Sequence, residues 1–234
     1  MSISNYLAEL VRAQLEGRKP AEVPQGITIE EILDIAYRNH MEYLLLGALL
    51  KTEGLIEAHK GIMRGKVMNS LMKTMAQVTE LKDMERSFEE AGIKNQPMKG
   101  ARMKFIYPSP EMREMSDIDV LIDGDCMKKA AEILAEKGYE LSRSVKHHDI
   151  YKKGPFMVIE AHKVMYDKTV DGEQYKYFSN FSRAVLREGM KYTYDFIPED
   201  FYVYMMAHMA KHFYTMGCGI RNLVDLYVYR EKFG

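Results

Sequence analysis

Apolar residues in the N-terminal part of the chain recur at the spacing of amphipathic helices. The first of these patterns stops at Gly17 and Pro20, two residue types that commonly end helices. Thr28 is expected to cap the next helix, because Glu31 follows it at the spacing of a capping box. The segment 41–52 is apolar almost all round, which is typical of a buried helix. We therefore predict an entirely helical N-terminal region.

A single long helix is predicted over residues 57–91, where the helical period continues without interruption. Gly92 is the type of residue that usually ends a helix. The basic residues of its first half are interpreted as a solvated face rather than a phosphate-binding one; they are Lys60, Arg64, Lys66 and Lys73. The apolar stripe that we expect to be buried comprises Leu71, Met75, Val78, Leu81, Met84 and Phe88.

The pattern changes after Gly92, where short apolar runs and turn residues replace the helical period. Residues 117–122 alternate acidic and apolar side chains before becoming fully apolar, which predicts a strand. The other expected strands cover 93–98, 139–145, 148–152 and 156–162, and the expected helices cover 101–107 and 127–137. Strands before and after a crossover helix predict a mixed sheet with helices packed on it.

The chain returns to a helical pattern at Pro198, and a last helix is expected from Ile220. The side of the first of these helices that we expect to be buried carries Tyr202, Met205, Met206, Met209 and Phe213. The predicted fold class is therefore α+β, with a small mixed β-sheet core flanked by N-terminal and C-terminal helices. The expected regions are N-terminal helices at 1–92, an α/β core at 93–197 and C-terminal helices at 198–234.

Charge and composition narrow the class of protein. The chain has 33 basic and 34 acidic residues, so no overall field indicates long nucleic acid as a partner. The longest apolar stretch, Leu44–Leu50, is too short for a membrane span, and the N-terminus is amphipathic, unlike a signal peptide. Two cysteines, Cys126 and Cys218, are too few for a disulfide framework. We expect a cytoplasmic protein without a membrane partner, and we interpret its 19 methionines as adaptable core filling.

Two aspartates provide the first candidate chemistry. Asp117 and Asp119 are separated by one residue of the predicted strand, so their carboxylates leave the same face. Ile118 and Val120 are expected on the opposite, buried face. Two like charges held this close repel each other, and a bound Mg²⁺ removes that penalty because hard cations prefer carboxylate oxygens. Such a pair is a weak signal alone, so its surroundings decide its meaning.

The surroundings of the pair resemble the DNA polymerase β-type nucleotidyltransferase superfamily. In that family a strand ends in Gly-Gly or Gly-Ser, the next strand carries two aspartates one residue apart, and a further strand carries a third acid. Here the three positions are occupied by 98–101 (MKGA), 116–122 (SDIDVLI) and 159–162 (IEAH). The combined pattern resembles most closely a poorly characterised bacterial branch known as nucleotidyltransferase family proteins. The motifs span about residues 93 to 165.

The resemblance implies transfer of a nucleoside monophosphate from a nucleoside triphosphate to an unknown acceptor hydroxyl on a small molecule, a protein or an RNA end. Asp117, Asp119 and Glu160 would be the catalytic residues and the ligands of Mg²⁺ or Mn²⁺. Glu160 would ligate a second ion or accept the proton of the hydroxyl. The two metal ions would stabilise the attacking and the leaving oxygens of the transferred phosphate.

Several neighbours would bind the nucleotide. Lys99 and Arg113 would neutralise phosphate charge, and the fork of Arg113 is the better match to phosphate oxygens. A loop residue at that position can instead pair with Glu111 or Glu114. Ser116, directly before the acidic pair, completes the expected phosphate side of the site.

The chain also departs from the family pattern. Lys99 and Gly100 replace the usual Gly-Gly or Gly-Ser, so a serine that touches the phosphates in the family is missing. Gly100 would still allow the backbone to approach a phosphate closely. The gap before the acidic strand is lengthened by a loop at Pro108 and Pro110. These departures support an alternative function, a catalytically degenerate nucleotide-binding or interaction module.

His208 and His212 lie four residues apart, on one face of a predicted helix. Such a pair can bind zinc, but Met209 stands where metalloproteases have glutamate. The two histidines are expected either to line the nucleotide or acceptor side of the cleft or to pack against the sheet. Arg221 and Asp225 have the same spacing on the last helix and are expected to form an intrahelical or interhelical pair.

Overall fold

The computed structural model describes residues 1–215 and 217–234. The N-terminal part contains α1 (Ile3–Leu15), α2 (Ile29–Arg38), the π-helical turn η1 (Glu42–Leu46), α3 (Gly47–Leu49) and the long α4 (Glu57–Glu90). The middle part contains β1 (Asn95–Pro97), α5 (Lys99–Met103), η2 (Pro110–Met112), β2 (Ile118–Ile122), η3 (Gly124–Cys126), α6 (Met127–Glu136), β3 (Glu140–Ser144), β4 (His148–Lys153) and β5 (Met157–His162). The C-terminal part contains α7 (Gly172–Tyr177), β6 (Ala184–Leu186), β7 (Tyr194–Phe196), α8 (Pro198–Thr215) and α9 (Ile220–Phe233).

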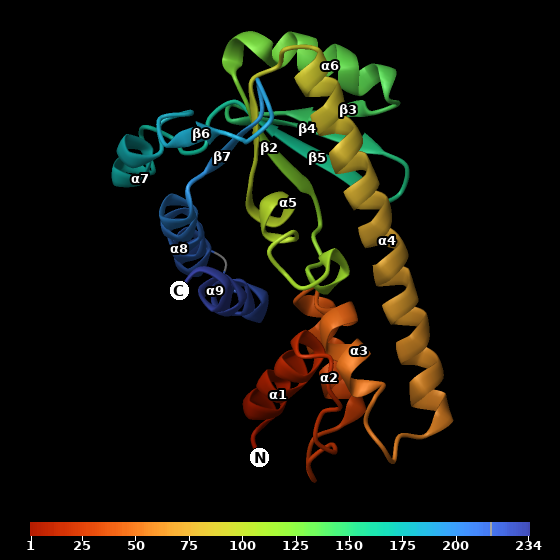
Figure 1. Ribbon diagram of the computed structural model, residues 1–234. Coiled ribbons are helices and arrows are strands. Elements are labelled where there is room, and N and C mark those ends of the chain that lie inside the picture. Colours follow the sequence, from red (N-terminus) through yellow and green to blue (C-terminus); the bar gives the residue numbers. More distant parts are fainter. Residues whose placement is uncertain (216) are drawn as a thin grey trace.

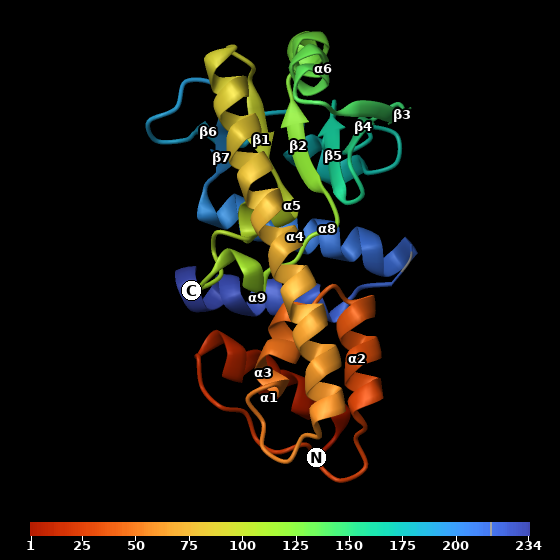
Figure 2. The same cartoon turned by 90° about the vertical axis from the view of Figure 1, so that its right-hand side faces the viewer.

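The centre of the fold is a five-stranded sheet in the order β1-β2-β5-β4-β3 (Figure 1 and Figure 2). β2 runs parallel to β5, and the other neighbouring strands are antiparallel. The α+β class and the mixed sheet predicted from the sequence are confirmed. The sequence did not predict the separate two-stranded sheet of β6 and β7 or the short helix α7. Each of these strands has three residues, too few to establish a period.

One face of the sheet is packed by α4 and α6. Ile118, Val120 and Ile122 of β2 are completely buried there against apolar side chains of the two helices. Strand side chains alternate between faces, so Asp119 and Leu121 leave the opposite face. β2 therefore directs Ile118, Val120 and Ile122 into this core and Asp119 to the other face, where Leu121 belongs to a separate apolar cluster.

The buried stripe of α4 differs from the predicted one in its first half. Val78, Leu81, Met84 and Phe88 are buried as predicted. Met75 is 48 % exposed, and polar Thr74 and Gln77 take its place in the interior. Gln77 Nε2 donates a hydrogen bond to Met115 O, 3.1 Å away, because α4 crosses the loop before β2 at this level. The pattern predicted the wrong buried residues here because the helix meets a backbone carbonyl of this loop instead of an apolar layer.

A second core joins the N-terminal helices to α8 and α9. Figure 2 shows α8 and α9 crossing the molecule between the sheet and the N-terminal helices. The capping box of α2 is confirmed, since Thr28 Oγ1 accepts a hydrogen bond from Glu31 N and Glu31 Oε2 accepts one from Thr28 N. The segment predicted as a buried helix is buried at Leu44–Leu46, where it forms the π-helical turn η1.

The predicted buried side of α8 is wrong at three of its five positions, whereas Met205 and Met209 are half-buried. Tyr202, Met206 and Phe213 are exposed, whereas Phe201 and Tyr204 are buried. The helical period continues from these two residues to His208, whose polar side chain concealed the true stripe. None of the helices within residues 1–215 and 217–234 is long and apolar enough to cross a membrane.

Candidate active site

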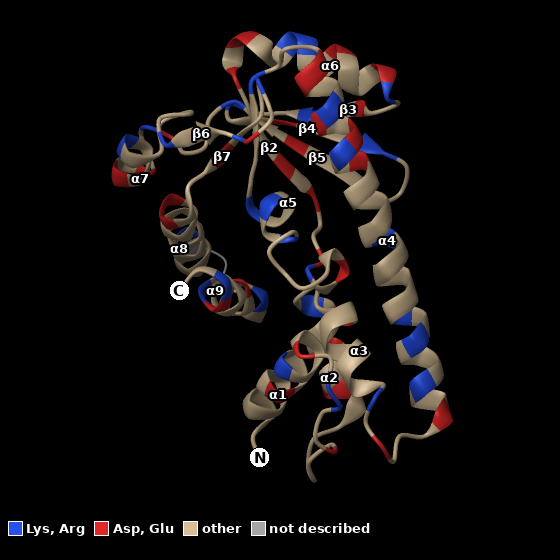
Figure 3. Cartoon of the chain, in the orientation of Figure 1, with Lys and Arg blue, Asp and Glu red and all other residues tan. Residues whose placement is uncertain are grey.

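The sheet brings together acids from two separate strands. Asp119 of β2 lies directly opposite Glu160 of β5 in the parallel register. Both side chains leave the face opposite to the buried Ile118 and Ile159. Asp117 precedes β2 and lines the same hollow as the other two. We call Asp117, Asp119 and Glu160 the acidic centre. Figure 3 shows the acidic positions of β2 and β5 close to the basic start of α5.

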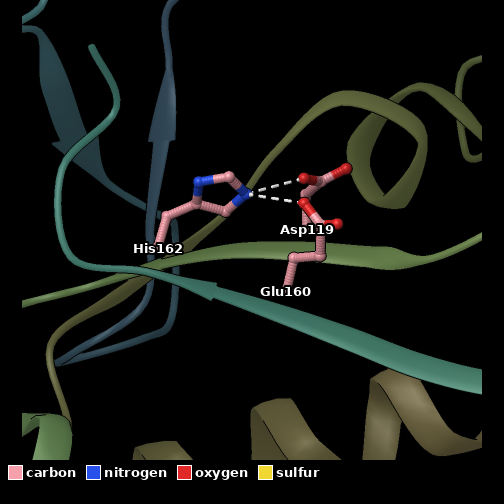
Figure 4. A group of neighbouring side chains, drawn as sticks. All are labelled: Asp119, Glu160 and His162. Carbon is pink, nitrogen blue, oxygen red and sulfur yellow. Dashed lines mark hydrogen bonds and ion pairs between the residues drawn. The ribbon is translucent and has the colours of Figure 1, made fainter. Parts of the chain in front are cut away.

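His162 joins the acidic centre and was missed as a functional residue from the sequence. Its Nε2 lies 2.8 Å from Asp119 Oδ1 and 3.5 Å from Glu160 Oε2 (Figure 4). One ligand atom from each of these three side chains lies within 4.8 Å of the others, a spacing that allows them to hold one metal ion. The signal was present in the sequence, because residues two apart on a strand share a face with each other. Glu160 and His162 have that spacing.

The basic partner of Asp119 is Lys99. Lys99 Nζ lies 2.6 Å from Asp119 Oδ1, the same oxygen that His162 contacts. Lys99 has a positive φ of 44°, a conformation that side chains other than glycine adopt only at a cost. Burial alone would lower the pKa of Lys99, but the charge of Asp119 outweighs it and raises that pKa. The amine of Lys99 therefore stays protonated and places a positive charge at the acidic centre.

The two aspartates differ in their proton affinity. Burial and the charge of Asp119 raise the pKa of Asp117 to about 6. Burial would also raise the pKa of Asp119, but Lys99 and His162 hold it well below its usual range. The expected repulsion between the two carboxylates therefore contributes to the raised pKa of Asp117. At Asp119 the favourable contacts with Lys99 and His162 outweigh the effect of burial on the pKa. Ser116 is exposed beside them, with its Oγ 3.5 Å from Asp117 Oδ1.

Gly100 is required by close packing within the protein. A Cβ atom at this position would lie 3.2 Å from Met115 Cβ and 3.5 Å from Arg113 Nη1. α5 therefore packs tightly against the segment that leads into β2. The predicted role of Gly100 in admitting a phosphate stays a prediction beside this structural role.

Arg113 is 5 % exposed and is bound to the last helix. Its Nε and Nη2 donate to Asp225 Oδ1 and Oδ2 at 2.7 and 2.9 Å, and its Nη1 donates to Glu114 O. The alternative expectation of an ion pair with the Glu111 or Glu114 carboxylate is wrong. Asp225 occupies two of the guanidinium donors of Arg113, which leaves fewer of them for a phosphate. The phosphate role of Arg113 stays a prediction, and a second arginine is a candidate for the same role.

That candidate is Arg221 on α9, which lines the same hollow as Asp117 and Lys99. Its Nη1 donates to Glu114 O at 3.3 Å, and its buried Nε has no hydrogen-bond partner among the residues that the structure describes. Burial, with the nearby charge of Arg113, lowers the pKa of Arg221 to about 10. The predicted ion pair between Arg221 and Asp225 is wrong, because Asp225 binds Arg113 instead. Sequence spacing alone could not distinguish these partners.

His208 and His212 lie on α8 with their ring centroids 4.4 Å apart. Burial and the charge of Lys99 lower the pKa of His208 to about 3, so its imidazole is neutral. The metal-capable group found in the described part of the chain contains neither histidine. Both line the hollows described next, and their predicted place on the nucleotide or acceptor side of the cleft stays a prediction.

Two hollows adjoin at the acidic centre. The first, of about 270 Å³, is lined by residues that include Gly100, Asp117 and Arg221. The second, of about 370 Å³, is lined by residues that include His148, His162 and Tyr166. Their shared walls are Lys99, Glu160, Tyr204, His208 and His212. The site can therefore receive two groups that meet at Glu160.

Residues 25–234 match the model of a protein family described as an uncharacterised nucleotidyltransferase. The chain belongs to this family. The match includes every residue of the acidic centre, Lys99 and Arg221. No curated protein sequence matches the chain.

Solved nucleotidyltransferases share the fold. A solution structure of the antibiotic-resistance factor ANT(2'')-Ia has a TM-score of 0.51 at 9 % identity and covers 69 % of this chain and 86 % of its own. A crystal structure of ANT(2'')-Ia with adenylyl-2''-tobramycin has a TM-score of 0.50 at 10 % identity and covers 68 % of this chain and 90 % of its own. A weaker similarity, with a TM-score of 0.40 at 14 % identity, is to an antigenic nucleotidyltransferase-like protein from Paracoccidioides brasiliensis and covers 67 % of this chain and 74 % of that one.

Proposed function

We propose that this protein transfers a nucleoside monophosphate from a nucleoside triphosphate to an acceptor hydroxyl, with a divalent cation at the acidic centre. The observation that carries the proposal is the meeting of Asp119 and Glu160 from separate strands, with Asp117 beside them at the edge of a hollow. Carboxylate oxygens are the ligands that Mg²⁺ and Mn²⁺ prefer, so these residues fit such an ion. Bound there, the ion would neutralise phosphate charge and favour ionisation of the hydroxyl.

The first hollow is suited to the triphosphate. Lys99 and Arg221 supply positive charge to it, and the Nε of Arg221 is a donor without a partner among the described residues. A buried unpaired donor is costly, and a phosphate oxygen would remove that cost. Lys99 would leave Asp119 and follow the phosphates, which carry more negative charge than one carboxylate. Its side chain would then act as a point charge against the triphosphate.

The second hollow is suited to the acceptor, because it adjoins the first at Glu160. The acceptor oxygen would form a bond to the α-phosphorus while the bond from that phosphorus to the β-phosphate oxygen breaks. Pyrophosphate leaves, and the proton of the hydroxyl passes to the Glu160 carboxylate. An adenylylated product is named in one structure of ANT(2'')-Ia, which supports a hydroxyl on a small molecule as the acceptor here.

The test is a transfer assay with each nucleoside triphosphate, Mg²⁺ or Mn²⁺ and a small-molecule extract, read by pyrophosphate release and by mass spectrometry of nucleotide-tagged products. We expect Asp119→Asn and Asp117→Asn to lower transfer by at least about a hundredfold, the scale lost with one electrostatic group of an active site. Glu140→Gln, on the exposed strand β3, is the matched control and is expected to retain full activity. Full activity in both aspartate variants would refute the proposal.

A second candidate function is nucleotide binding without turnover. It is favoured by Lys99 and Gly100, which replace the family's usual Gly-Ser so that the phosphate-contacting serine is missing, and by the contact of Lys99 with Asp119. Calorimetric titration would then give nucleoside triphosphate affinity, while no pyrophosphate is released over a broad range of acceptors. Nucleotide-tagged product from any acceptor would exclude this function.

A further inference from the structure

The position of His162 relative to the two strand acids has the geometry of a metal ligand. Donors that are neighbours around one cation, with bonds of roughly 2.1 Å, lie about 3 Å from each other. His162 Nε2 lies 2.8 Å from Asp119 Oδ1 and 3.5 Å from Glu160 Oε2, so the imidazole nitrogen already has nearly this separation from both carboxylates. Figure 4 shows the imidazole directed at the two carboxylates. Binding of an ion requires that Lys99 Nζ leave Asp119 Oδ1, which it contacts at 2.6 Å.

Neighbouring strands hold the imidazole in this place. His162 ends β5, where the backbone pairs with Leu121 of β2 on one side and with His148 of β4 on the other. The rings of His148 and His162 lie 5.1 Å apart at an angle of 38°. The side chain is therefore fixed by paired strands on both sides, as a ligand of a preorganised site must be.

The chemistry of the ligand set then bears on the choice of ion. Mg²⁺ is bound through carboxylates, phosphates and water and is a poor match for nitrogen. First-row transition cations accept imidazole nitrogen together with carboxylate oxygen. We propose that His162 Nε2 is a direct ligand of the ion at the acidic centre, which makes this site selective for Mn²⁺ over Mg²⁺. The inference rests on the proposed function, because it uses the same metal centre.

Lys99 and His162 have different parts in this scheme although they contact the same oxygen. An ammonium group has only donors and cannot bind a cation, whereas an imidazole can present a lone pair. Lys99 would therefore leave Asp119 Oδ1 for the ion to bind, whereas His162, which lies 2.8 Å from that oxygen in this structure, would stay and hold the ion with it. The triphosphate attracts Lys99 and thereby assists the exchange.

The experiment is pulsed electron paramagnetic resonance of Mn²⁺ bound to the full-length protein with inorganic triphosphate, a probe that contains no nitrogen. We expect a nitrogen modulation from a directly bound imidazole, which changes frequency when the protein is labelled with ¹⁵N. His162→Gln should abolish this modulation and weaken Mn²⁺ binding about tenfold, with Mg²⁺ binding changed less. His148→Gln, the matched control at the facing strand position, should keep the modulation.

Wild-type protein that binds Mn²⁺ without a nitrogen modulation would overturn the inference and leave the proposed function standing. The same holds if the modulation survives in His162→Gln. Wild-type protein that binds neither ion in the presence of triphosphate would overturn both. The wild-type measurement decides the matter even if the His162 variant fails to fold, because the ¹⁵N label already shows whether a protein nitrogen is bound.

Discussion

Arg113 and Asp225 form a buried ion pair between the loop that leads into the acidic strand and the last helix. The guanidinium donates through Nε and Nη2 to both carboxylate oxygens, at 2.7 and 2.9 Å, and Tyr107 donates its hydroxyl to Oδ1 of the same carboxylate at 2.8 Å. The pair links residues 112 positions apart. It fixes α9, and with it Arg221, as a wall of the first hollow.

The first prediction concerns the contribution of this ion pair to stability. Asp225→Ala leaves the Arg113 charge buried without a partner, and we expect the free energy of unfolding to fall by about 3–5 kcal/mol. Urea denaturation measures the change. Glu231→Ala on the same helix removes an exposed carboxylate and should cost less than about 1 kcal/mol. A loss below about 1 kcal/mol in Asp225→Ala would show that the pair does not secure α9.

Arg221 provides a prediction on nucleotide binding. Replacing it with methionine removes the buried donors of the first hollow, and we expect affinity for ATP to fall about tenfold to a hundredfold, as for a lost charge-assisted hydrogen bond. Isothermal titration calorimetry measures the affinity. Arg230→Met, an exposed arginine on the same helix, is the control and should bind ATP as the wild type does. Equal ATP affinity in both variants would remove Arg221 from the phosphate site.

Lys99 provides a prediction on metal binding without nucleotide. Lys99→Met keeps an unbranched side chain but removes the charge beside Asp119. We expect Mn²⁺ affinity to rise about tenfold and ATP affinity to fall, because the charge both competes with the metal and attracts the phosphates. A titration followed by electron paramagnetic resonance measures free Mn²⁺. Lys94→Met, near Asp123 rather than the acidic centre, should change neither affinity.

If Lys99→Met binds Mn²⁺ less tightly than the wild type, the lysine supports the metal site rather than competing with it. That result would also contradict the exchange of partners inferred for Lys99.

Lys104 provides a prediction on pH. Its Nζ donates to Arg113 O and Pro110 O while its side chain is completely buried, and burial with the charge of Arg113 lowers its pKa to about 7. The unfolded chain then binds more protons than the native protein between about pH 7 and 10, so stability rises with pH in that window. Urea denaturation at pH 7 and pH 9 should give a rise of about 2 kcal/mol.

Lys104→Met removes the titrating group, and the rise between pH 7 and pH 9 should be smaller in this variant by the same amount. Lys137→Met, at a lysine paired with Asp83 on the other face of the sheet, should keep the wild-type rise. An identical pH dependence in Lys104→Met and the wild type would show that the buried amine keeps an ordinary pKa.

Much of the fold was accessible from the sequence because its signals are local. The long helix was predicted at 57–91 and is observed at Glu57–Glu90. The Thr28 capping box depends on two residues three positions apart, and it formed as predicted. The alternation along 117–122 separated the acids from the buried apolar residues correctly. The division of the chain into three regions stays a prediction.

The site was accessible only in part. Asp117, Asp119 and Glu160 were selected by spacing and by resemblance, and the structure brings them to one face of the sheet. His162 was missed although it has the same two-residue spacing from Glu160 that links the two aspartates. Arg221 was predicted to pair with Asp225 because the two lie four residues apart on one helix. That spacing gives no information on a competing partner from another segment, and Arg113 is such a partner.

The sequence by itself determined the long helix α4, the capping box of Thr28 and the acidic face of β2, because each follows from steric and hydrogen-bonding preferences among residues a few positions apart. Only the tertiary structure decided that Lys99 contacts Asp119, that Arg113 takes Asp225 and that Arg221 keeps an unpaired Nε among the described residues. These choices depend on which charges are buried together and at what distance. The electrostatic energy of such a pair changes steeply with distance and burial, and the order of residues along the chain specifies neither.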